Sequence, residues 1–397
     1  MDKRLLALAL GTFAIGTDNY VVAGILPQVA RSFDVNVAAA GQFVTVYSLA
    51  YAVLTPVMAT LTAHWPRRRV LLTGLAVFIA ANVLTATQAS FALALLGRAL
   101  AGLGGAMFTP MAGAAAAALV APERRGRALA IVLAGLSGAT ALGAPIGTLV
   151  AAAGDWRLTL WFVAGLGVLA ASCVAAALPA VAAPPPLTLR QRLAPLGDGR
   201  VTATLATTFV VMIGVFLIYT YISVVFDRAS LGDGTRLAAL LSIWGIAATV
   251  GNLAAGSLSD RFGNRRVINI AVAIVALDFA LMPWTATSLA GAVIALAVWG
   301  LCGWGFVVAQ QHRLVGIAPP LAPILLALNA AAIYLAVSVA GALGGLMIGL
   351  LDPHALPILS ALLIAGGLFG AELSHRLIRG GRASAAPPAP AVEAVRR

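Results

Sequence analysis

Apolar residues follow one another along this chain in long runs, which charged residues, prolines and glycines interrupt. A helix needs about 20 mainly apolar residues to cross the hydrocarbon core of a bilayer, and twelve runs have about that length or more. They cover residues 5–30, 40–63, 70–88, 91–120, 127–153, 157–180, 201–226, 236–258, 267–286, 289–311, 322–350 and 355–374. Because backbone polar groups must be paired inside a membrane, the pattern predicts an all-α integral membrane protein with twelve transmembrane helices.

A polar segment near the middle of the chain separates these runs into two sets of six. It predicts an N-terminal six-helix bundle at 1–180, a cytoplasmic linker at 181–200, a C-terminal six-helix bundle at 201–378, and a disordered Pro/Ala-rich cytoplasmic tail at 379–397. Two similar loops, ATLTAHWPRRRVL (59–71) and GSLSDRFGNRRVI (256–268), join the second and third helices of each set. Such repeats are related by an axis along the membrane normal and predict a central cavity between two bundles.

Composition and charge place the chain in a lipid bilayer rather than on nucleic acid. Hydrophobic residues make up 61% of the chain and charged residues 10%, whereas a soluble domain has about 25% charged residues. The net charge is +12, but its distribution follows topology: with the N-terminus inside the cell, 20 of the 25 Lys and Arg residues lie on the cytoplasmic side and four on the other. The positive-inside rule therefore predicts that both termini are cytoplasmic. Cys173 and Cys302 lie in apolar runs and predict no disulfide.

One acid interrupts the first apolar run. Asp18 lies in GTDNYVV, near the middle of 5–30, where a carboxylate costs at least roughly 2.5–3.5 kcal/mol. At 1.5 Å per residue, Asp18 and Arg98 of the fourth run reach a similar depth, so they can form a pair where their two helices are neighbours. A carboxylate whose pairing with the arginine forms and breaks as the conformation changes would bind and release a proton. Alternatively, the carboxylate would balance the charge of a cationic substrate. A static pair that fixes helix packing is the alternative.

Four stretches resemble those of a known family. They are GTDNYVVAGILP with AGQFVTVYSLAYAVLTP, GRALAGLGGAMFTP around Arg98, GLSGATALGAPIGT (135–148), and a G-x3-D-R-x-G-x-R-R loop that is complete at 256–266. On these residues the chain resembles the major facilitator superfamily along its whole length. Within that superfamily it is similar to the twelve-helix drug:proton antiporter branch, and to bacterial sugar, arabinose and nucleoside efflux permeases. The resemblance implies the major facilitator fold, the bacterial cytoplasmic (inner) membrane and a monomer.

The resemblance also implies roles for particular residues. Proton coupling is expected at Asp18 and Arg98, and a hinge in the fifth helix at Gly143, Pro145 and Gly147, although ordinary small-residue packing would explain the glycines too. A conformational latch is expected at Asp260, Arg261, Gly263, Arg265 and Arg266. Asp260 is expected to cap the next helix and pair with a nearby arginine. The first-half loop has Ala63 and Pro66 where the family has an acid and a glycine, which puts a latch there in doubt.

Other polar and aromatic residues of the apolar runs are candidates for substrate contact or for packing. The predicted substrate-binding residues are Asn19, Tyr20, Met107, Tyr219, Tyr221, Gln310, Asn329 and Tyr334. Asp278, in the ninth run, is expected to lie away from the cavity and to form a hydrogen bond with a neighbouring helix.

These expectations favour a secondary active transporter that exports a small amphipathic or cationic, drug-like compound in exchange for protons by alternating access. Proton-coupled efflux of a neutral solute, such as a sugar or a nucleoside, is the alternative. No enzymatic activity is expected, because the four histidines lie near the ends of the runs without the spacing of a catalytic or metal site. No P-loop pattern and no cofactor motif is present in the sequence.

Overall fold

The computed structural model describes residues 2–179 and 187–384, and within these ranges every regular element is helical. Twelve helical spans are long and apolar enough to cross a membrane, as the sequence predicts. The spans of the first half are α1 (Lys3–Ser32), α3 (Gln42–Leu61), α4 (Arg67–Thr87), α5 (Phe91–Ala118), the broken helix of α6 (Arg125–Gly138), η2 (Ala139–Gly143) and α7 (Ala144–Ala152), and α8 (Trp156–Ala177). Those of the second half are α10 (Gly199–Thr220), α13 (Gly234–Phe262), α14 (Asn264–Thr285), α15 (Leu289–Ile317), α16 (Ala322–Ile348) and α17 (Leu356–Ser384).

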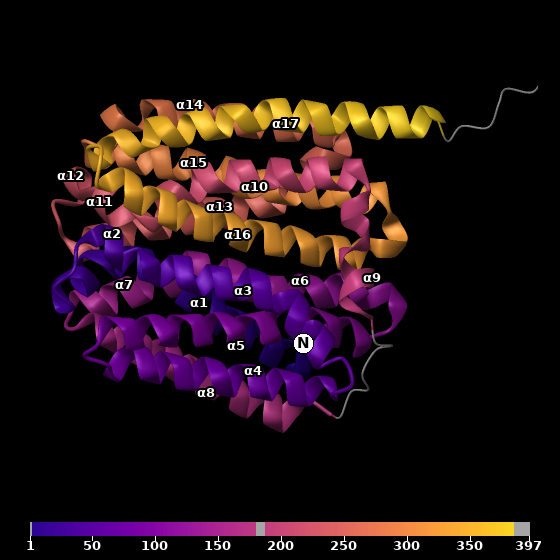
Figure 1. Ribbon diagram of the computed structural model, residues 1–397, viewed down its shortest axis with the longest axis horizontal. Helices are drawn as coiled ribbons and strands as arrows, with labels where there is room; N and C mark the ends of the chain where they lie inside the picture. The colour runs from indigo at the N-terminus through magenta and orange to yellow at the C-terminus, as the bar shows by residue number, and fades with distance from the viewer. Residues whose placement is uncertain (1, 180–186, 385–397) are drawn as a thin grey trace, which may run out of the picture.

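The spans pack side by side in two sets (Figure 1). In the first half α4 packs between α5 and α8, and α1 packs between α8 and the broken helix of α6, η2 and α7. In the second half α10 packs against α16 and α17, and α15 packs between α13 and α14. Two pairs of spans join the halves: α3 lies along α16, and α13 lies along η2 and α7.

Short helices and capping side chains mark the turns between spans. These helices are α2 (Val37–Ala40), η1 (Pro122–Arg124), α9 (Leu189–Leu193), η3 (Ala194–Gly197), α11 (Ile222–Val225), α12 (Asp227–Ser230), η4 (Pro319–Leu321) and η5 (Pro353–Ala355). Asp155, Asp198 and Asp233 each accept a hydrogen bond from a backbone N–H in the first turn of the following span. Such side chains satisfy donors that a helix start leaves free.

Two predicted segments are more helical than the sequence indicates. Part of the predicted 181–200 linker forms α9, which begins with a capping box between Thr188 and Gln191. At the other end of the chain, α17 continues to Ser384. Residues 379–384 are therefore helical rather than part of a disordered tail. The remaining predicted tail, 385–397, and residues 180–186 lie outside the described residues.

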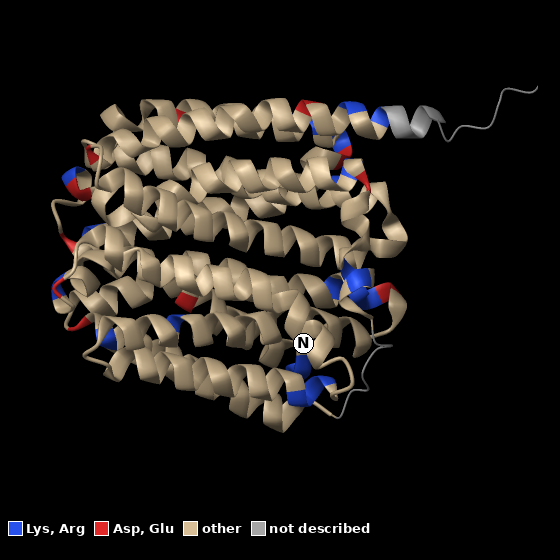
Figure 2. Ribbon diagram, viewed as in Figure 1, with Lys and Arg blue, Asp and Glu red and all other residues tan. Residues whose placement is uncertain are grey.

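Charged residues gather at the two ends of the bundle (Figure 2). Lysine and arginine predominate at the end that holds the N-terminus, α9 and the starts of α4, α6 and α14, which we call the basic end. At the other end, called the opposite end, both acidic and basic residues occur around α2 and α12. This unequal distribution of lysine and arginine between the two ends is the feature from which the cytoplasmic position of the termini is predicted.

Candidate functional site

Asp18 of α1 and Arg98 of α5 form an ion pair inside the first half. The distance from Asp18 Oδ1 to Arg98 Nη1 is 2.7 Å, and their side chains are 0% and 1% exposed. The contact that their similar depth predicts is therefore present. Burying a charged side chain is costly unless it is paired, and here the two opposite charges lie in direct contact.

Two neighbouring helices, α3 and α4, complete the surroundings of the ion pair. Arg98 Nε donates a hydrogen bond of 3.4 Å to the Phe43 carbonyl, and its guanidinium lies 4.7 Å from the centre of the Tyr47 ring. The Asn82 side chain of α4 faces Asp18. Asp18 Oδ2 is buried and has no hydrogen-bond partner among the described residues. One carboxylate oxygen is thus available for a proton or a water molecule.

A line of aromatic rings leads from this ion pair to the interface between the halves. The Tyr47 ring, beside Arg98, lies 6.4 Å from that of Tyr51, and Tyr51 stacks on Tyr334 of α16 with ring centres 3.7 Å apart. Gly102 and Gly105 of α5 lie against these two tyrosines of α3, where a Cβ would be crowded. The ion pair is therefore connected through side-chain contacts to the second half.

Tyr20, two residues after Asp18, makes a second contact across the interface. Its ring lies 5.6 Å from Tyr219, 6.1 Å from Trp244 and 6.1 Å from Trp304. The Tyr219 hydroxyl donates a hydrogen bond of 3.0 Å to the Tyr20 carbonyl. We call Tyr20, Tyr51, Tyr219, Trp244, Trp304 and Tyr334 the aromatic interface; three of these six, Tyr20, Tyr219 and Tyr334, are predicted substrate-binding residues. The rings fill the space where the sequence predicts a central cavity.

The other predicted substrate-binding residues lie elsewhere. Tyr221 is at the opposite end, where its hydroxyl donates to the Gly341 carbonyl at 2.7 Å and its ring packs against Gly41 and Gly344. Met107 packs against Gly74 of α4, inside the first half. Both side chains have packing contacts that account for their burial, so the structure does not group them with the aromatic interface.

Three predicted substrate-binding residues carry amides. Gln310 Nε2 donates to the Thr204 carbonyl and to Thr208 Oγ1, both at 3.2 Å, within the second half. Asn329 is fully buried, and neither polar atom of its side chain has a partner among the described residues. Asn19 is 7% exposed, with its Oδ1 likewise unpaired. These amides retain hydrogen-bonding capacity in the interior of the bundle.

The fifth span is broken by a turn of π-helix, η2, and Pro145 lies in the first turn of α7. Two glycines at and after the break contact α1: Gly143, the last residue of η2, fits against Thr17, and Gly147 of α7 fits against Val21. On another face Gly245 of α13 fits against the backbone of Thr140 in η2. The predicted irregularity is present, and it occurs where α13 of the second half packs against the first half. Its role as a hinge stays a prediction.

The predicted latch loop differs from expectation. Asp260 lies in the last turn of α13, is exposed, and forms no ion pair within the described residues. Gly263, with a φ of 80°, occupies the cap position of α14 and makes no side-chain hydrogen bond, so the expected capping by Asp260 is wrong. Arg265 instead binds Glu372 of α17 through two hydrogen bonds, of 3.0 and 2.9 Å. Arg261 lies over the Phe262 ring, 5.2 Å from its centre.

Asp278 does not form the hydrogen bond that the sequence predicts. Its Oδ2 is buried without a partner among the described residues, and it lies near Cys302 of α15. α14, which carries it, packs against α13, α15 and α17 of its own half. Asp278 is therefore away from the interface, as expected, but unpaired.

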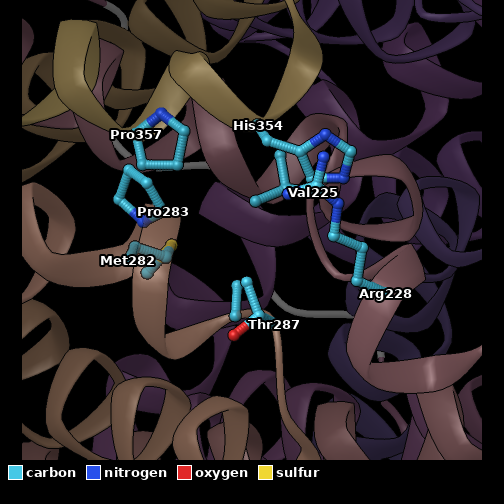
Figure 3. Close-up of a pocket in the computed structure, with 8 residues that line it drawn as sticks. Val225, Arg228, Met282, Pro283, Thr287, His354 and Pro357 are labelled. Atoms are coloured by element: carbon cyan, nitrogen blue, oxygen red, sulfur yellow. The ribbon is translucent and has the colours of Figure 1, made fainter.

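A polar cluster at the opposite end was not predicted. His354 lies between two carboxylates, with Nε2 2.8 Å from Asp227 Oδ1 and Nδ1 2.7 Å from Asp352 Oδ1. It joins α12 to η5, and with Arg228 it borders a small pocket (Figure 3). The ring bonds two different carboxylates on opposite edges. The described residues contain no group of three or more His, Cys, Asp or Glu side chains suited to a metal ion.

Five residues of the site itself were not among those predicted from the sequence. Tyr47, Tyr51, Asn82, Trp244 and Trp304 all contact the ion pair or its aromatic neighbours. The available signals were an amide inside the third apolar run, and tyrosines four residues apart in the second. Each signal is common in membrane helices, and neither identifies a site alone.

Twelve apolar spans in two sets, with an ion pair buried beside their interface, are typical of multi-pass transport proteins. Residues 8–320 match the family model of the Major Facilitator Superfamily. The chain is 30% identical over 377 residues to the inner membrane transport protein YdhP of Escherichia coli (strain K12), covering 95% of this chain and 97% of that protein. It is 35% identical over 268 residues to a chloramphenicol resistance protein of Streptomyces lividans, covering 66% of this chain and 68% of that protein.

Solved structures agree with this assignment at the level of the fold. A D-xylose-proton symporter superposes with a TM-score of 0.77 at 16% identity, covering 94% of this chain and 97% of that chain. A bacterial homologue of the lysosomal transporter Spinster superposes with a TM-score of 0.74 at 15% identity, covering 95% and 97%. The chain belongs to the Major Facilitator Superfamily and is a multi-pass membrane transporter.

Proposed function

We propose that this transporter exports a small amphipathic compound from the bacterial cytoplasm in exchange for protons. Asp18 is the proton carrier and Arg98 its conformation-dependent partner. The basic end faces the cytoplasm, in accordance with the positive-inside rule. The observation that carries the proposal is the fully buried ion pair, 2.7 Å long, with a second carboxylate oxygen left unpaired.

A proton on Asp18 would remove the carboxylate's charge and weaken its bond to Arg98. Arg98 contacts Tyr47, and the ring contacts continue through Tyr51 to Tyr334 of the other half. Proton binding is thereby linked to the interface along which the halves would move. In alternating access, the two bundles rock about this region while substrate and proton are bound in different states.

The test uses bacterial cells that lack their own efflux pumps. Retention of chloramphenicol and of ethidium, a fluorescent cation, is compared between cells with the wild-type protein, cells with Asp18→Asn, and cells treated with a protonophore. We expect the wild type to lower retention of at least one compound, and both perturbations to abolish that effect. Asp278→Asn is the matched control, because it makes the same change in an intramembrane acid away from the interface.

A second measurement separates proton coupling from simple structural damage. In proteoliposomes, Asp18→Asn is expected to retain exchange of labelled substrate down its gradient, while losing accumulation driven by a pH gradient. If the wild type, shown to be present in the membrane, changes the retention of neither compound, the proposal is contradicted. The neutral-solute alternative would then be tested with labelled D-xylose and inosine.

A further inference from the structure

The charged side chains within the membrane are few, and their arrangement restricts what the aromatic interface can accept. Away from the two ends of the bundle, the described spans hold three charged side chains: Asp18, Arg98 and Asp278. Asp278 lies on α14, which packs only within the second half among the contacts of the described helices. The charge near the interface is therefore that of the Asp18–Arg98 pair.

This pair has two charge states. With the carboxylate ionised the pair is neutral, since a guanidinium keeps its proton at physiological pH. With a proton on Asp18 the pair carries a charge of +1. In neither state is there a net negative charge to balance a cation in a medium of low polarity, where an unbalanced charge is costly.

The aromatic interface offers the other part of a binding surface. The Tyr20 ring meets those of Tyr219, Trp244 and Trp304 edge to face, and the rings of Tyr51 and Tyr334 are stacked. Aromatic faces attract both cations and uncharged rings, so the rings alone do not choose between them. The charge of the ion pair does, because it disfavours the cation in both of its states.

Uncharged polar groups are also available close by. Asn19 Oδ1, beside Tyr20 in the chain, is buried without a partner, and a ligand N–H or O–H would satisfy it. Buried polar groups that lack partners favour a ligand with hydrogen-bonding substituents over a pure hydrocarbon.

We propose that the substrate is an uncharged aromatic compound with polar substituents, and that one molecule leaves for each proton that enters. This inference rests on the proposed function and specifies its substrate class. The proton binds the Asp18 carboxylate from one side and leaves it on the other, and no covalent bond of the substrate changes. Each cycle then moves one positive charge inward, so transport responds to membrane potential as well as to the pH gradient.

The experiment compares two probes that share one skeleton. Chloramphenicol is uncharged, and the quaternary trimethylammonium analogue of its deacylated amine carries a permanent positive charge. Purified full-length protein in liposomes is given a potassium diffusion potential at equal pH on both sides, with protein-free liposomes as the control. An inside-positive potential is expected to drive chloramphenicol inward. With one net charge moved per cycle, its inside-to-outside concentration ratio should reach up to about tenfold at 59 mV. The charged analogue is expected to be exchanged at least tenfold more slowly.

Changing the charge of the pair supplies the decisive variant. Arg98→Gln leaves Asp18 as the only charge of the pair, so that the site is negative or neutral. This variant is expected to transport the charged analogue faster, relative to chloramphenicol, than the wild type does. Arg98→Lys keeps the charge and the preference for chloramphenicol. The thermal stability of each variant in detergent shows whether that variant is folded. The comparison of the two probes with the wild-type protein tests the inference even if a variant does not fold.

The outcomes distinguish this inference from the function on which it rests. Proton-coupled transport of the charged analogue at a rate comparable to that of chloramphenicol overturns the inference but leaves proton-coupled export intact. If chloramphenicol transport does not depend on the imposed membrane potential, the proposed exchange of one molecule for one proton is wrong. Transport of neither probe, by protein that is folded in the liposomes, contradicts both.

Discussion

Tyr51 of α3 and Tyr334 of α16 stack across the boundary between the two halves, with ring centres 3.7 Å apart and planes 20° from parallel. Each ring belongs to a different half, so the stack exists only while the halves are close at this depth. Nearer the opposite end, Tyr221 and Gly341 of the second half lie against Gly41 and Thr45 of the first. The structure is therefore one in which the opposite end is closed.

Replacing the ring of Tyr51 is expected to open this closure more often. An aromatic pair contributes about 0.5–1.5 kcal/mol beyond burial, so Tyr51→Ala should raise the population of the open state by about two- to tenfold. Thr45→Cys, in a chain with Cys173→Ala and Cys302→Ala, reports opening through its rate of reaction with a water-soluble maleimide. Tyr51→Phe keeps the ring and should leave the rate unchanged. An alanine variant that labels no faster would show that the stack does not hold this state.

A side chain at Gly245 is expected to destabilise the contact between α13 and η2. A Cβ there would overlap the backbone of Thr140 and Ala141, and overpacking of this kind costs about 1–3 kcal/mol. Gly245→Ala should therefore lower the thermal unfolding temperature in detergent by several degrees. Gly165→Ala of α8 is the matched control, because its added methyl group has open space. Equal melting temperatures for the two variants would contradict the prediction.

The histidine cluster predicts a pH dependence at the opposite end. Hydrogen bonds from the backbone and ring of His354 lower the pKa of the Asp352 carboxyl. A lowered pKa in the folded state means that these bonds stabilise the fold above the ordinary carboxyl pKa and are lost as pH falls through the lowered value.

The thermal stability of Asp352→Asn should therefore lie below that of the wild type at pH 6, and the difference should shrink as the pH falls below the ordinary carboxyl pKa. Asp352 is exposed, so we expect a small difference that high salt reduces further. Asp34→Asn, which removes an exposed acid at the same end, serves as the control. If the difference in thermal stability between Asp352→Asn and the wild type were unchanged at pH 3, its cause would be the shape of the substituted side chain rather than the loss of the carboxylate charge.

The orientation of the bundle predicts which loops are accessible from outside the cell. Ala89 and Ala121 are both exposed and flank the two ends of α5, at the opposite and the basic end. In a chain without native cysteines, Ala89→Cys should react with a membrane-impermeant maleimide on intact cells. Ala121→Cys should react only after the cells are broken. The reverse result would invert the proposed orientation.

The spans could be predicted because lipid imposes a single requirement on every one of them: enough apolar residues to pair the backbone internally across the core. The Asp18–Arg98 contact could be predicted because depth follows from counting residues along a helix, and because the family resemblance implies that the first and fourth helices line the same cavity. The last six residues of the predicted run 201–226 show the limit, because they lie beyond the end of α10. The sequence places Tyr221 within the run 201–226, whereas the structure ends α10 at Thr220 and packs Tyr221 against glycines of other elements.

What the sequence could not show is which face of a helix is turned toward lipid. Both faces of these spans are apolar, so periodicity does not separate Tyr47 and Trp244, which lie in the interior, from Trp161 and Phe369, which are exposed on the bundle surface. The hydrogen bond expected for Asp278 failed for the same reason, because a partner depends on helix rotation. The pairing of Arg265 with Glu372 joins residues 107 positions apart, which no local pattern indicates.

The wide turn η2 also keeps the fifth span in register with α1. Gly135 lies against Ala9 and Thr12, and Gly143 against Thr17; eight residues of regular helix would rotate these glycines about 80° apart, at about 100° per residue. A π-turn absorbs one additional residue, which brings both glycines back to the same side. Removing one residue from 139–142 would therefore convert the break into continuous α-helix with both contacts preserved, whereas adding one would turn α7 away. This segment has the form of a one-residue insertion that the helix accommodates without losing its neighbour.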